Sequence, residues 1–323
     1  MNPNYEYWLS YEGLDADTRR ELESIEEDAD EIEARFAVPM RFGTAGLRSV
    51  MAAGISRMNV YTVAQTTQAL ANLVCRHGGQ ARGVAIAYDS RNNSMRFAET
   101  AAEVLAGNGV KVYIYESLRP TPCLSFAILQ LGCLAGINIT ASHNPKEYNG
   151  YKVYWEDGAQ LPPDHADEVS RETAGIDIFT GVRRLSFSEG CDQGLIVRIG
   201  EAMDEAFLRA VLDCRTDPEI LSKYGDAVGI VYTPLHGTGY RLVPEVLKRA
   251  GVTNLRVVES QRRPDGDFPT VAVPNPENKA CFAEAIDLVL RDGADCDLII
   301  GTDPDADRVG VVVKDANGLF VPL

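Results

Sequence analysis

Apolar runs alternate with amphipathic stretches in the first half of the chain. The segments 83–91, 110–116 and 134–142 are rich in Val, Ile, Ala and Tyr, as buried strands are. Between them, 94–109 and 123–132 carry apolar residues at helical spacing, and each stretch closes on a glycine. This order predicts a βαβαβ unit whose third strand ends at a serine, in a loop crowded with polar residues.

The same alternation returns in the second half. Strands are predicted within 226–237, over 254–260 and over 296–301, and helices over 240–251 and 279–293. Both units therefore end their third strand in a polar loop. In open α/β sheets ligands bind beyond the carboxyl ends of the strands, so both loops are candidates for chemistry.

Three further segments complete the outline. The acidic stretch 16–36 has the pattern of a helix with a solvated, charged face. Glycine is frequent and periodicity is weak over 175–200, which we interpret as a linker. The chain closes with apolar 309–314, an Asp-Ala-Asn-Gly turn and apolar 319–323, a pattern typical of a β-hairpin.

Length and composition fit this outline. With 323 residues, of which 45% are hydrophobic, the chain can build two cores. We predict an α/β protein of two tandem βαβαβ-type domains, one over 1–200 and one over 201–323 that ends in the hairpin.

Charge narrows the choice of partner. The net charge of −16, from 31 Lys and Arg against 47 Asp and Glu, disfavours nucleic acid and anionic membranes. A phosphorylated small molecule would need a local group of cations or a bound metal, because charges beyond about 8 Å are screened at physiological salt.

The termini and cysteines give little sign of export. The N-terminus lacks the basic and apolar regions of a signal peptide, and no run approaches the roughly 18 apolar residues of a membrane span. The 7 cysteines are scattered without Cys-x-x-Cys pairs, which favours reduced thiols over disulfides or a zinc site. We therefore expect a cytoplasmic protein.

The second polar loop, at 303–308, places carboxylates at Asp303, Asp305 and Asp307. Alternate residues of a straight strand lie about 6.6 Å apart, so the loop has to curl at Pro304 to bring all three to one ion. Hard oxygen donors of this kind suit Mg²⁺ or Mn²⁺ with positions left open for a phosphate. A solvated acidic turn is the alternative.

Two other metal-dependent families use acidic loops. An EF-hand needs glycine at its sixth position and glutamate at its twelfth, where this chain has Arg308 and Lys314. A haloacid-dehalogenase-type phosphotransferase has a D-x-D-x-[TV] signature after a strand. Here the fifth position is Asp307, and too few residues follow it for the remaining strands of that fold. A phosphotransferase of this type remains an enzymatic alternative.

Ser142 opens the first polar loop. A lone serine in a turn is usually structural, but His143, Asn144 and Lys152 lie in or near the same loop, and no G-x-S-x-G elbow is present. Because an unaided serine hydroxyl is a weak nucleophile, its surroundings have to activate it or hold it phosphorylated. A phosphoserine beside a cation held by three aspartates would account for both loops.

Two glycine-containing loops add candidate anion contacts. The sequence RFGTAGLR at 41–48 lets the backbone approach an anion closely while Arg41 and Arg48 frame it. The sequence TPLHGTGY at 233–240 lacks the third glycine of a dinucleotide fingerprint and the lysine of a P-loop. His236 within it is of a kind that is more often structural than catalytic.

Together these motifs resemble the α-D-phosphohexomutase superfamily of phosphoglucomutases and phosphomannomutases. TASHNP matches its phosphoserine loop, DPDADR its magnesium loop and RFGTAGLR its N-terminal arginine loop, and AYDSR, RPTP, YNGYKVY and TPLHG agree in the same order. The resemblance covers essentially the whole chain. It is closest to the first two domains of larger bacterial phosphoglucomutases, which implies three-layer α/β domains.

The resemblance implies a role for each motif. Ser142 would carry the phosphoryl group, and with Asp303, Asp305 and Asp307 it would hold Mg²⁺. Phosphoserine would give its phosphoryl group to a hexose phosphate, and the resulting 1,6-bisphosphate would turn over and return its other phosphate. The remaining implied site residues are Lys152 as general acid/base, Arg48, His143 and Arg308 around the phosphoryl group, and Arg41, Thr44, Asn144, Arg91 and His236 as substrate or phosphate contacts.

The expected reaction interconverts hexose 1-phosphate and hexose 6-phosphate, with α-D-glucose phosphates as the first choice and mannose or pentose phosphates open. Members of the superfamily continue into a third domain with a GEES-like loop and a fourth with an R-x-S-G-T-E-P-like loop, and neither motif occurs here. We therefore expect a fragment truncated before those domains, with little or no mutase turnover alone. A metal-binding or regulatory module is the non-enzymatic alternative.

Overall fold

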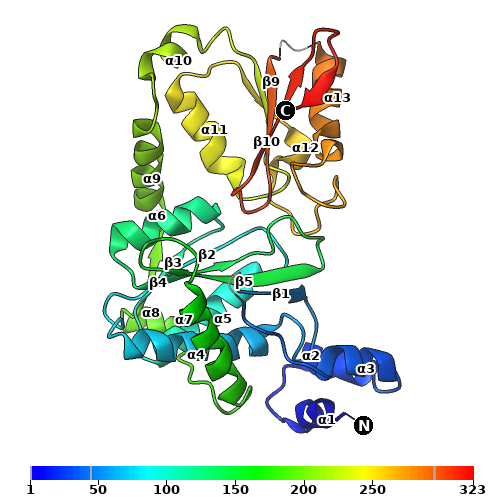
Figure 1. Ribbon diagram of the computed structural model, residues 1–323, viewed down its shortest axis with the longest axis vertical. Coiled ribbons are helices and arrows are strands. Elements are labelled where there is room, and N and C mark those ends of the chain that lie inside the picture. Colours follow the sequence, from blue (N-terminus) through cyan, green and yellow to red (C-terminus); the bar gives the residue numbers. More distant parts are fainter. Residues whose placement is uncertain (1, 44–45, 294–295) are drawn as a thin grey trace.

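The computed structural model describes residues 2–43, 46–293 and 296–323. Two β-sheets, each flanked by helices, follow one another along the chain, and Figure 1 shows the two units stacked along the long axis of the molecule. The predicted α/β fold with two units is confirmed.

The first sheet contains six strands. They are β1 (Leu47–Val50), β2 (Val84–Tyr88), β3 (Val112–Tyr115), β4 (Ala135–Ile139), β5 (Tyr148–Trp155) and β6 (Ile196–Ile199). Their order is β1-β5-β4-β2-β3-β6. The strands β4, β2, β3 and β6 run parallel, whereas β5 and β1 extend the sheet antiparallel.

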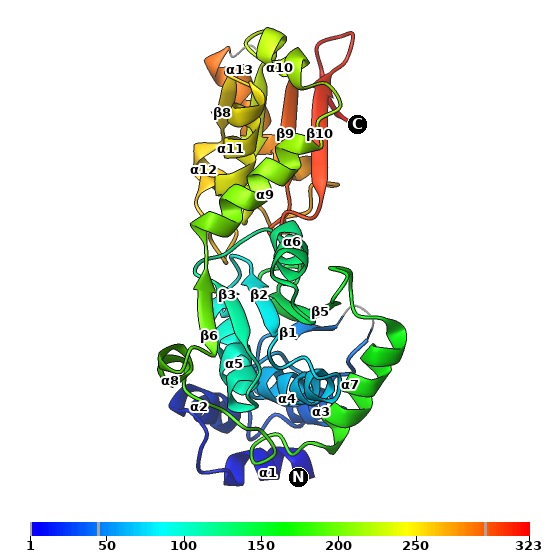
Figure 2. The ribbon, with the colours of Figure 1, turned by 90° about the vertical axis from the view of Figure 1, so that its left-hand side faces the viewer.

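Helices cover both faces of this sheet, as Figure 2 shows. The chain crosses from β2 to β3 in one direction and from β3 to β4 in the other, so right-handed crossovers place their helices on opposite faces. One face is covered by α4 (Val60–Arg76), α5 (Ser94–Gly107) and α7 (Pro163–Gly175), and the other by α6 (Thr121–Leu131).

Three sequence predictions for the first unit need correction. The acidic stretch 16–36 forms two helices, α2 (Ala16–Ser24) and α3 (Ala29–Phe36), which pack with α1 (Pro3–Ser10). The predicted linker contains α8 (Phe187–Asp192) and the strand β6, which pairs with β3. The alternation of buried and exposed residues along β6 is weak, because only one residue of this short edge strand is buried. The strand β4 ends at Ile139, so Ser142 lies in the loop beyond it.

The second sheet contains five strands. They are β7 (Ile230–Thr233), β8 (Leu255–Val257), β9 (Leu298–Thr302), β10 (Val309–Lys314) and β11 (Phe320–Pro322), in the order β11-β10-β9-β7-β8. The strands β8, β7 and β9 are parallel, and β10 and β11 form the predicted hairpin. The helices of this unit are α10 (Pro218–Tyr224), α11 (Gly239–Ala250), α12 (Glu259–Arg262), the 3₁₀ helix η1 (Lys279–Phe282) and α13 (Ala283–Asp292).

The two units share a hydrophobic contact. The helix α9 (Glu201–Asp213) follows directly on β6 and packs against α6, and the Phe126 and Phe207 rings meet edge to face with centroids 5.5 Å apart. Met203, Leu208 and Leu242 from the second unit belong to one buried cluster with residues of α6, β2 and β3. The contact therefore holds the carboxyl ends of the parallel strands of both sheets toward each other, as Figures 1 and 2 show.

Within the described residues, none of the helices combines the length and the apolar character that crossing a bilayer requires.

Candidate functional site

Ser142 lies in the loop that follows β4, in a left-handed backbone conformation. Its φ is 51°, which is uncommon for a residue with a side chain. The amide of Ser142 donates to Thr140 Oγ1 at 2.8 Å, and the Ser142 carbonyl accepts from Arg91 at 2.6 Å. The side chain is buried, with 4% of the residue exposed. The loop therefore fixes where the hydroxyl points.

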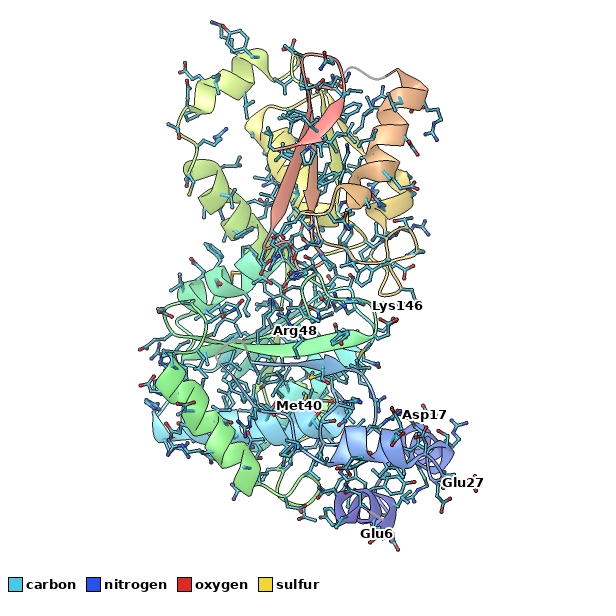
Figure 3. All side chains as sticks on the ribbon, turned by 45° about the vertical axis from the view of Figure 1, so that its right-hand side comes forward. Glu6, Asp17, Glu27, Met40, Arg48 and Lys146 are labelled. Atoms are coloured by element: carbon cyan, nitrogen blue, oxygen red, sulfur yellow. The ribbon has the colours of Figure 1, made fainter. Side chains whose placement is uncertain are left out.

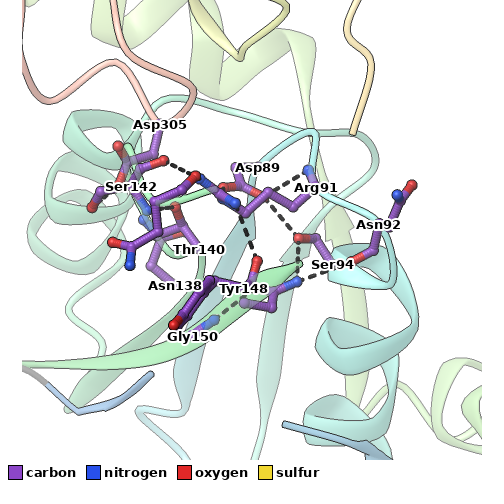
Figure 4. A network of polar contacts seen from close by, with 12 residues as sticks. Asp89, Arg91, Asn92, Ser94, Asn138, Thr140, Ser142, Tyr148, Gly150 and Asp305 are labelled. Carbon is purple, nitrogen blue, oxygen red and sulfur yellow. Dashed lines mark hydrogen bonds and ion pairs between the residues drawn. The ribbon is translucent and has the colours of Figure 1, made fainter. Parts of the chain in front are cut away.

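Arg91 binds the backbone of this loop, as Figure 4 shows. Its guanidinium donates to the carbonyls of four residues, namely Ser142, Asn144, Pro145 and Tyr148. Its Nε lies 3.3 Å from Asp89 Oδ2 in a buried ion pair. Burial lowers the pKa of Arg91 and raises the pKa of Asp89, and the attraction between the two opposes both shifts.

This arrangement differs from the predicted role of Arg91 as a phosphate contact. The residue is 3% exposed and its donors are committed to backbone carbonyls. Its outer face lies against the Phe268 ring of the second unit, 5.1 Å from the centroid. The sequence named Arg91 as a candidate phosphate contact and did not predict its carbonyl partners, because binding to backbone carbonyls has no sequence motif.

The second polar loop, residues 303–308, follows β9 and is called the acidic loop below. A tight turn joins the Asp303 carbonyl to the amide of Ala306 at 2.9 Å, and Ala306 has a φ of 51°. Gly237, in the loop between β7 and α11, lets the acidic loop approach closely. A Cβ at that position would lie 2.6 Å from the Pro304 carbonyl oxygen. The curl predicted at Pro304 is present, and one oxygen from each aspartate lies within 4.8 Å of the others.

Positive φ angles recur around the contact between the units. Besides Ser142 and Ala306, Leu235, His236 and Phe268 have φ between 46° and 61°. Such conformations cost about 1 to 3 kcal/mol each and persist only where the surrounding structure fixes them. Their clustering marks this contact as the candidate site.

The serine and the acidic loop meet at Asp305. Ser142 Oγ donates to Asp305 Oδ2 at 3.2 Å, and Lys152 Nζ donates to Ser142 Oγ at 2.6 Å and to Asp305 Oδ2 at 3.1 Å. Lys152 comes from β5, directly opposite Asn138 on β4, and is 4% exposed. Asp307 Oδ2 lies 3.7 Å from Lys152 Nζ. The Ser142 hydroxyl, the Lys152 ammonium and the Asp305 carboxylate thus meet at one buried position, and Asp307 lies beside them on the exposed side.

The acidic loop is not satisfied by these partners alone. Asp303 Oδ2 and Asp305 Oδ1 are buried and have no hydrogen-bond partner within the described part of the chain. Burial raises the pKa of Asp303, and the carboxylates of Asp305 and Asp307 raise it further. Burial also acts to raise the pKa of Asp305, but the Lys152 ammonium outweighs it and the net shift is downward.

A divalent cation fits this pattern of charge. Unpaired buried carboxylate oxygens are costly unless they are hydrogen-bonded or coordinate a metal. Three aspartate oxygens close together are the hard donors that Mg²⁺ and Mn²⁺ prefer. Burial lowers the pKa of Lys152, yet Asp305, Tyr154 and Asp307 together outweigh burial and keep the pKa above its ordinary value.

Cationic groups line the exposed edge of the site. Arg48 Nη1 donates to Asn144 Oδ1 at 2.9 Å, and Arg308 reaches Glu277 Oε1 at 3.0 Å. Burial and these two arginines lower the pKa of His143, whose buried Nδ1 lacks a partner among the described residues. Figure 3 shows Arg48 and Lys146 on the side of the first unit that faces the second, whereas Glu6, Asp17 and Glu27 lie at its far end.

Other predicted site residues lie elsewhere or have other partners. Arg41 is exposed and lines a cavity of about 990 Å³ beside α4 and α7, and Ser142 does not line that cavity. Thr44 lies outside the described residues. His236 is 2% exposed, and its ring nitrogens contact the Arg263 carbonyl at 3.1 Å and Thr270 Oγ1 at 3.0 Å. Both nitrogens are therefore engaged within the second unit, which does not support a phosphate contact.

Two polar side chains that the sequence did not single out are linked to Asp305, Thr121 directly and Asn138 through Thr121. Thr121 Oγ1 donates to Asp305 Oδ2 at 3.1 Å, and Asn138 Nδ2 donates to Thr121 Oγ1 at 2.6 Å. Thr121 belongs to the RPTP motif, which has the pattern of an ordinary turn after a strand. A polar Asn138 at the centre of an otherwise apolar strand was the available signal.

Comparisons with known proteins show the family to which the chain belongs. Residues 39–178 match the model of phosphoglucomutase/phosphomannomutase alpha/beta/alpha domain I, and residues 205–318 match that of domain II. The chain belongs to the phosphoglucomutase/phosphomannomutase family. Its membership in the α-D-phosphohexomutase superfamily, predicted from the motifs, is confirmed.

Relatives of this chain include the phosphoglucomutases of two staphylococci. The Staphylococcus epidermidis protein is 39% identical over 282 residues, 86% of this chain and 50% of that protein. The Staphylococcus aureus MRSA252 protein is 36% identical over 308 residues, 90% of this chain and 51% of that protein. The chain thus spans about half the length of the curated relatives it matches.

Among solved structures, a Thermus thermophilus protein described as a candidate phosphomannomutase superimposes with a TM-score of 0.72. It is 28% identical, and the match covers 88% of this chain and 58% of that one.

Proposed function

We propose that this chain carries the phosphoryl-transfer part of a phosphohexomutase site, with Ser142 as the residue that accepts and donates the phosphoryl group. The observation that supports it most directly is the position of Ser142 Oγ, 2.6 Å from Lys152 Nζ and 3.2 Å from Asp305 Oδ2. The reaction is the interconversion of a hexose 1-phosphate and its 6-phosphate. The staphylococcal relatives are named phosphoglucomutases, which favours α-D-glucose phosphates.

Asp303, Asp305 and Asp307 would hold Mg²⁺, together with an oxygen on Ser142. When bound, this ion would neutralise charge on the phosphoryl oxygens and polarise the phosphorus. The two orphaned oxygens of Asp303 and Asp305 are the structural basis for this assignment. The ion itself is proposed as Mg²⁺ because the open positions and oxygen ligands suit it.

The remaining site residues would handle the proton and the charge. When phosphoserine passes its phosphoryl group to a hydroxyl of the hexose phosphate, the bond between phosphorus and Ser142 Oγ breaks. Lys152 is placed to donate the proton that Ser142 Oγ then needs and to take up the proton that the hexose hydroxyl loses. In the reverse step Lys152 takes that proton back as Ser142 Oγ attacks phosphorus. Arg48 and Arg308 would stabilise phosphoryl charge, and His143 and Asn144 would shape the loop between them.

The proposal predicts transfer of one phosphoryl group to Ser142. The chain, incubated with Mg²⁺ and α-D-glucose 1,6-bisphosphate, should gain the mass of one phosphate, and peptide mapping should place it on Ser142. Ser142→Ala is the matched control and should gain none. Modification of another residue, or none in the presence of bound Mg²⁺, would contradict the proposal.

Substrate choice needs a separate measurement. Bisphosphates of glucose, mannose and ribose can be compared as donors to Ser142 at equal concentrations, and we expect the glucose compound to be the fastest. Sugar phosphates are thus the proposed small-molecule partners, and a cytoplasmic location remains a prediction from the sequence.

A further inference from the structure

The segment Arg119–Thr121 contacts the second unit at two separate points. Arg119 donates from Nε and Nη2 to the two carboxylate oxygens of Asp204, at 2.7 and 2.8 Å. Two residues on, the Thr121 amide donates to the Asp305 carbonyl at 2.8 Å and its hydroxyl reaches the Asp305 carboxylate at 3.1 Å. One short segment thus joins α9 and the acidic loop.

The Arg119 end is firmly attached to the first unit. Arg119 is 2% exposed, its amide donates to the Tyr88 carbonyl at 3.1 Å, and its Nη1 donates to Ser117 and Leu118. Asp204 is 3% exposed. A buried bidentate pair of this kind has one favoured geometry, so it fixes α9 against the first sheet more sharply than apolar packing does.

The Thr121 end is positioned equally well. Thr121 is the first residue of α6, and its hydroxyl accepts from Asn138 on β4 at 2.6 Å. The amino end of α6, with its partial positive charge, faces the acidic loop. Asp305, the residue it contacts, is the aspartate that hydrogen-bonds Ser142.

We propose that Arg119, Asp204 and Thr121 form an interdomain clamp that sets the distance between the acidic loop and Ser142. They are positioning residues, because each of them acts on Ser142 through Asp305 or through α9. The three aspartates lie on one loop of the second unit, so opening the clamp should separate them from Ser142 without dispersing them. The catalytic consequence rests on the function proposed above, whereas the contact itself does not.

The Thr121 amide gives a direct readout of the clamp. As the first residue of a helix it has no acceptor within the helix, so its protection from hydrogen exchange has to come from the Asp305 carbonyl. In the unmodified, metal-free chain we expect this amide to exchange at least about tenfold more slowly than an unbonded amide. Unprotected exchange there would overturn the proposal without any variant.

Two variants open the clamp. Asp204→Asn removes the charge, and the double variant Arg119→Met with Asp204→Leu removes the whole pair while keeping the volume filled, which often preserves stability. Both should speed Thr121 exchange about tenfold or more while amides inside α6 keep their protection.

Both variants should also slow phosphorylation of Ser142 about tenfold or more, because small misplacements of reacting groups reduce rates by factors of that order. The Kd for Mn²⁺ should change by a smaller factor than the phosphorylation rate, because the three aspartates stay together and only the oxygen on Ser142 moves away.

Glu205→Gln is the matched control. Glu205 is the neighbour of Asp204 on α9, but it pairs with Arg249 on α11, inside the second unit and on its surface. This variant should leave Thr121 exchange and Ser142 phosphorylation within about twofold of the unmodified chain, as most surface changes do.

The outcomes separate the two proposals. If clamp variants that stay folded keep both the slow Thr121 exchange and the phosphorylation rate, the clamp is refuted. If Mn²⁺ affinity falls as steeply as phosphorylation, the residues act on the metal loop itself and the clamp is likewise refuted. If the unmodified chain never phosphorylates Ser142, the proposed function fails, and Thr121 exchange still decides whether the clamp exists.

Discussion

The two loops that meet at the site are held in opposite ways. The loop of Ser142 is tied to its own unit, because Arg91 donates to four of its carbonyls and the Ser142 amide finds Thr140. The acidic loop packs three carboxylates together and leaves two buried oxygens without partners among the described residues.

The difference shows which loop has its backbone held by this chain and which loop needs a ligand for its carboxylates. A loop whose backbone carbonyls are satisfied gains stability from the contacts that shape it. A loop of crowded carboxylates loses stability in the absence of a cation and recovers it when the cation binds. We therefore expect stability to depend on Arg91 whether or not metal is present, and any stabilisation by metal to act through the acidic loop.

Arg91→Met should have the largest effect. It leaves several loop carbonyls without a donor and removes the ion-pair partner of buried Asp89, and breaking a buried pair in this way costs about 3 to 5 kcal/mol. Urea denaturation gives the free energy of unfolding. Arg41→Met, at an exposed position, is the control and should change stability by less than about 0.5 kcal/mol. Equal losses in both variants would contradict the role assigned to Arg91.

Within the acidic loop, two similar substitutions should differ. Asp305→Asn removes the charge that faces buried Lys152 and should cost about 3 kcal/mol in metal-free buffer. Asp303→Asn should change stability by less than about 0.5 kcal/mol, because burial and its neighbours raise the pKa of Asp303 and an amide replaces a largely neutral acid. The reverse order of effects would show that the charge resides on Asp303.

Metal should stabilise the unmodified chain and neither of those variants. Mn²⁺ or Mg²⁺ at about 100 times its Kd should raise the free energy of unfolding by about 2.7 kcal/mol. The measurement is a thermal or urea titration against metal concentration, with Ca²⁺ as a comparison ion. Stabilisation that persists in Asp303→Asn and Asp305→Asn would place the metal elsewhere.

Asp15, a carboxylate far from the site, provides a comparison with Asp303 and the smallest expected effect on stability. Asp15 caps α2 and accepts from the Thr18 amide at 3.0 Å and from the Tyr61 hydroxyl at 3.1 Å. Burial acts to raise the pKa of Asp15, but these hydrogen bonds outweigh it and the net shift is downward, opposite to Asp303.

Asp15→Ala should therefore cost about 1 kcal/mol at pH 7, the usual value of an N-cap. A lowered pKa means that this contribution is complete above the unfolded pKa of about 3.9 and is lost as the pH falls through the folded value. Urea denaturation at pH 7 and pH 3 should show a larger difference between the two proteins at pH 7. Asp15→Asn, which keeps the acceptor, should be less sensitive to pH, and a cost that is independent of pH would contradict the assignment.

Local pattern alone was enough to predict most of the central elements. Strands β2, β3, β4, β7 and β9, helices α5, α6, α11 and α13 and the terminal hairpin all follow from apolar runs and glycine stops. Local pattern failed to predict β6, a short edge strand that depends on pairing with β3. It also misplaced the end of β4, because Thr140 and Ala141 are buried although they lie beyond the paired residues of that strand. Pairing with a distant strand decides both cases, and local pattern does not contain it.

For the site, the sequence by itself determined the chemical groups: a serine after one strand, three aspartates after another, and a lysine in or near the serine's loop. Residue type and spacing suffice for this, because hydroxyl, ammonium and carboxylate chemistry belongs to the side chains. Only the tertiary structure decided that Asp305 is the aspartate that meets Ser142, that Arg91 binds carbonyls, and that Thr121 and Asp204 link the units. The contacts join residues far apart in the chain, 51 positions for Arg91 with Ser142 and 184 for Thr121 with Asp305, and only packing of the folded chain brings them together.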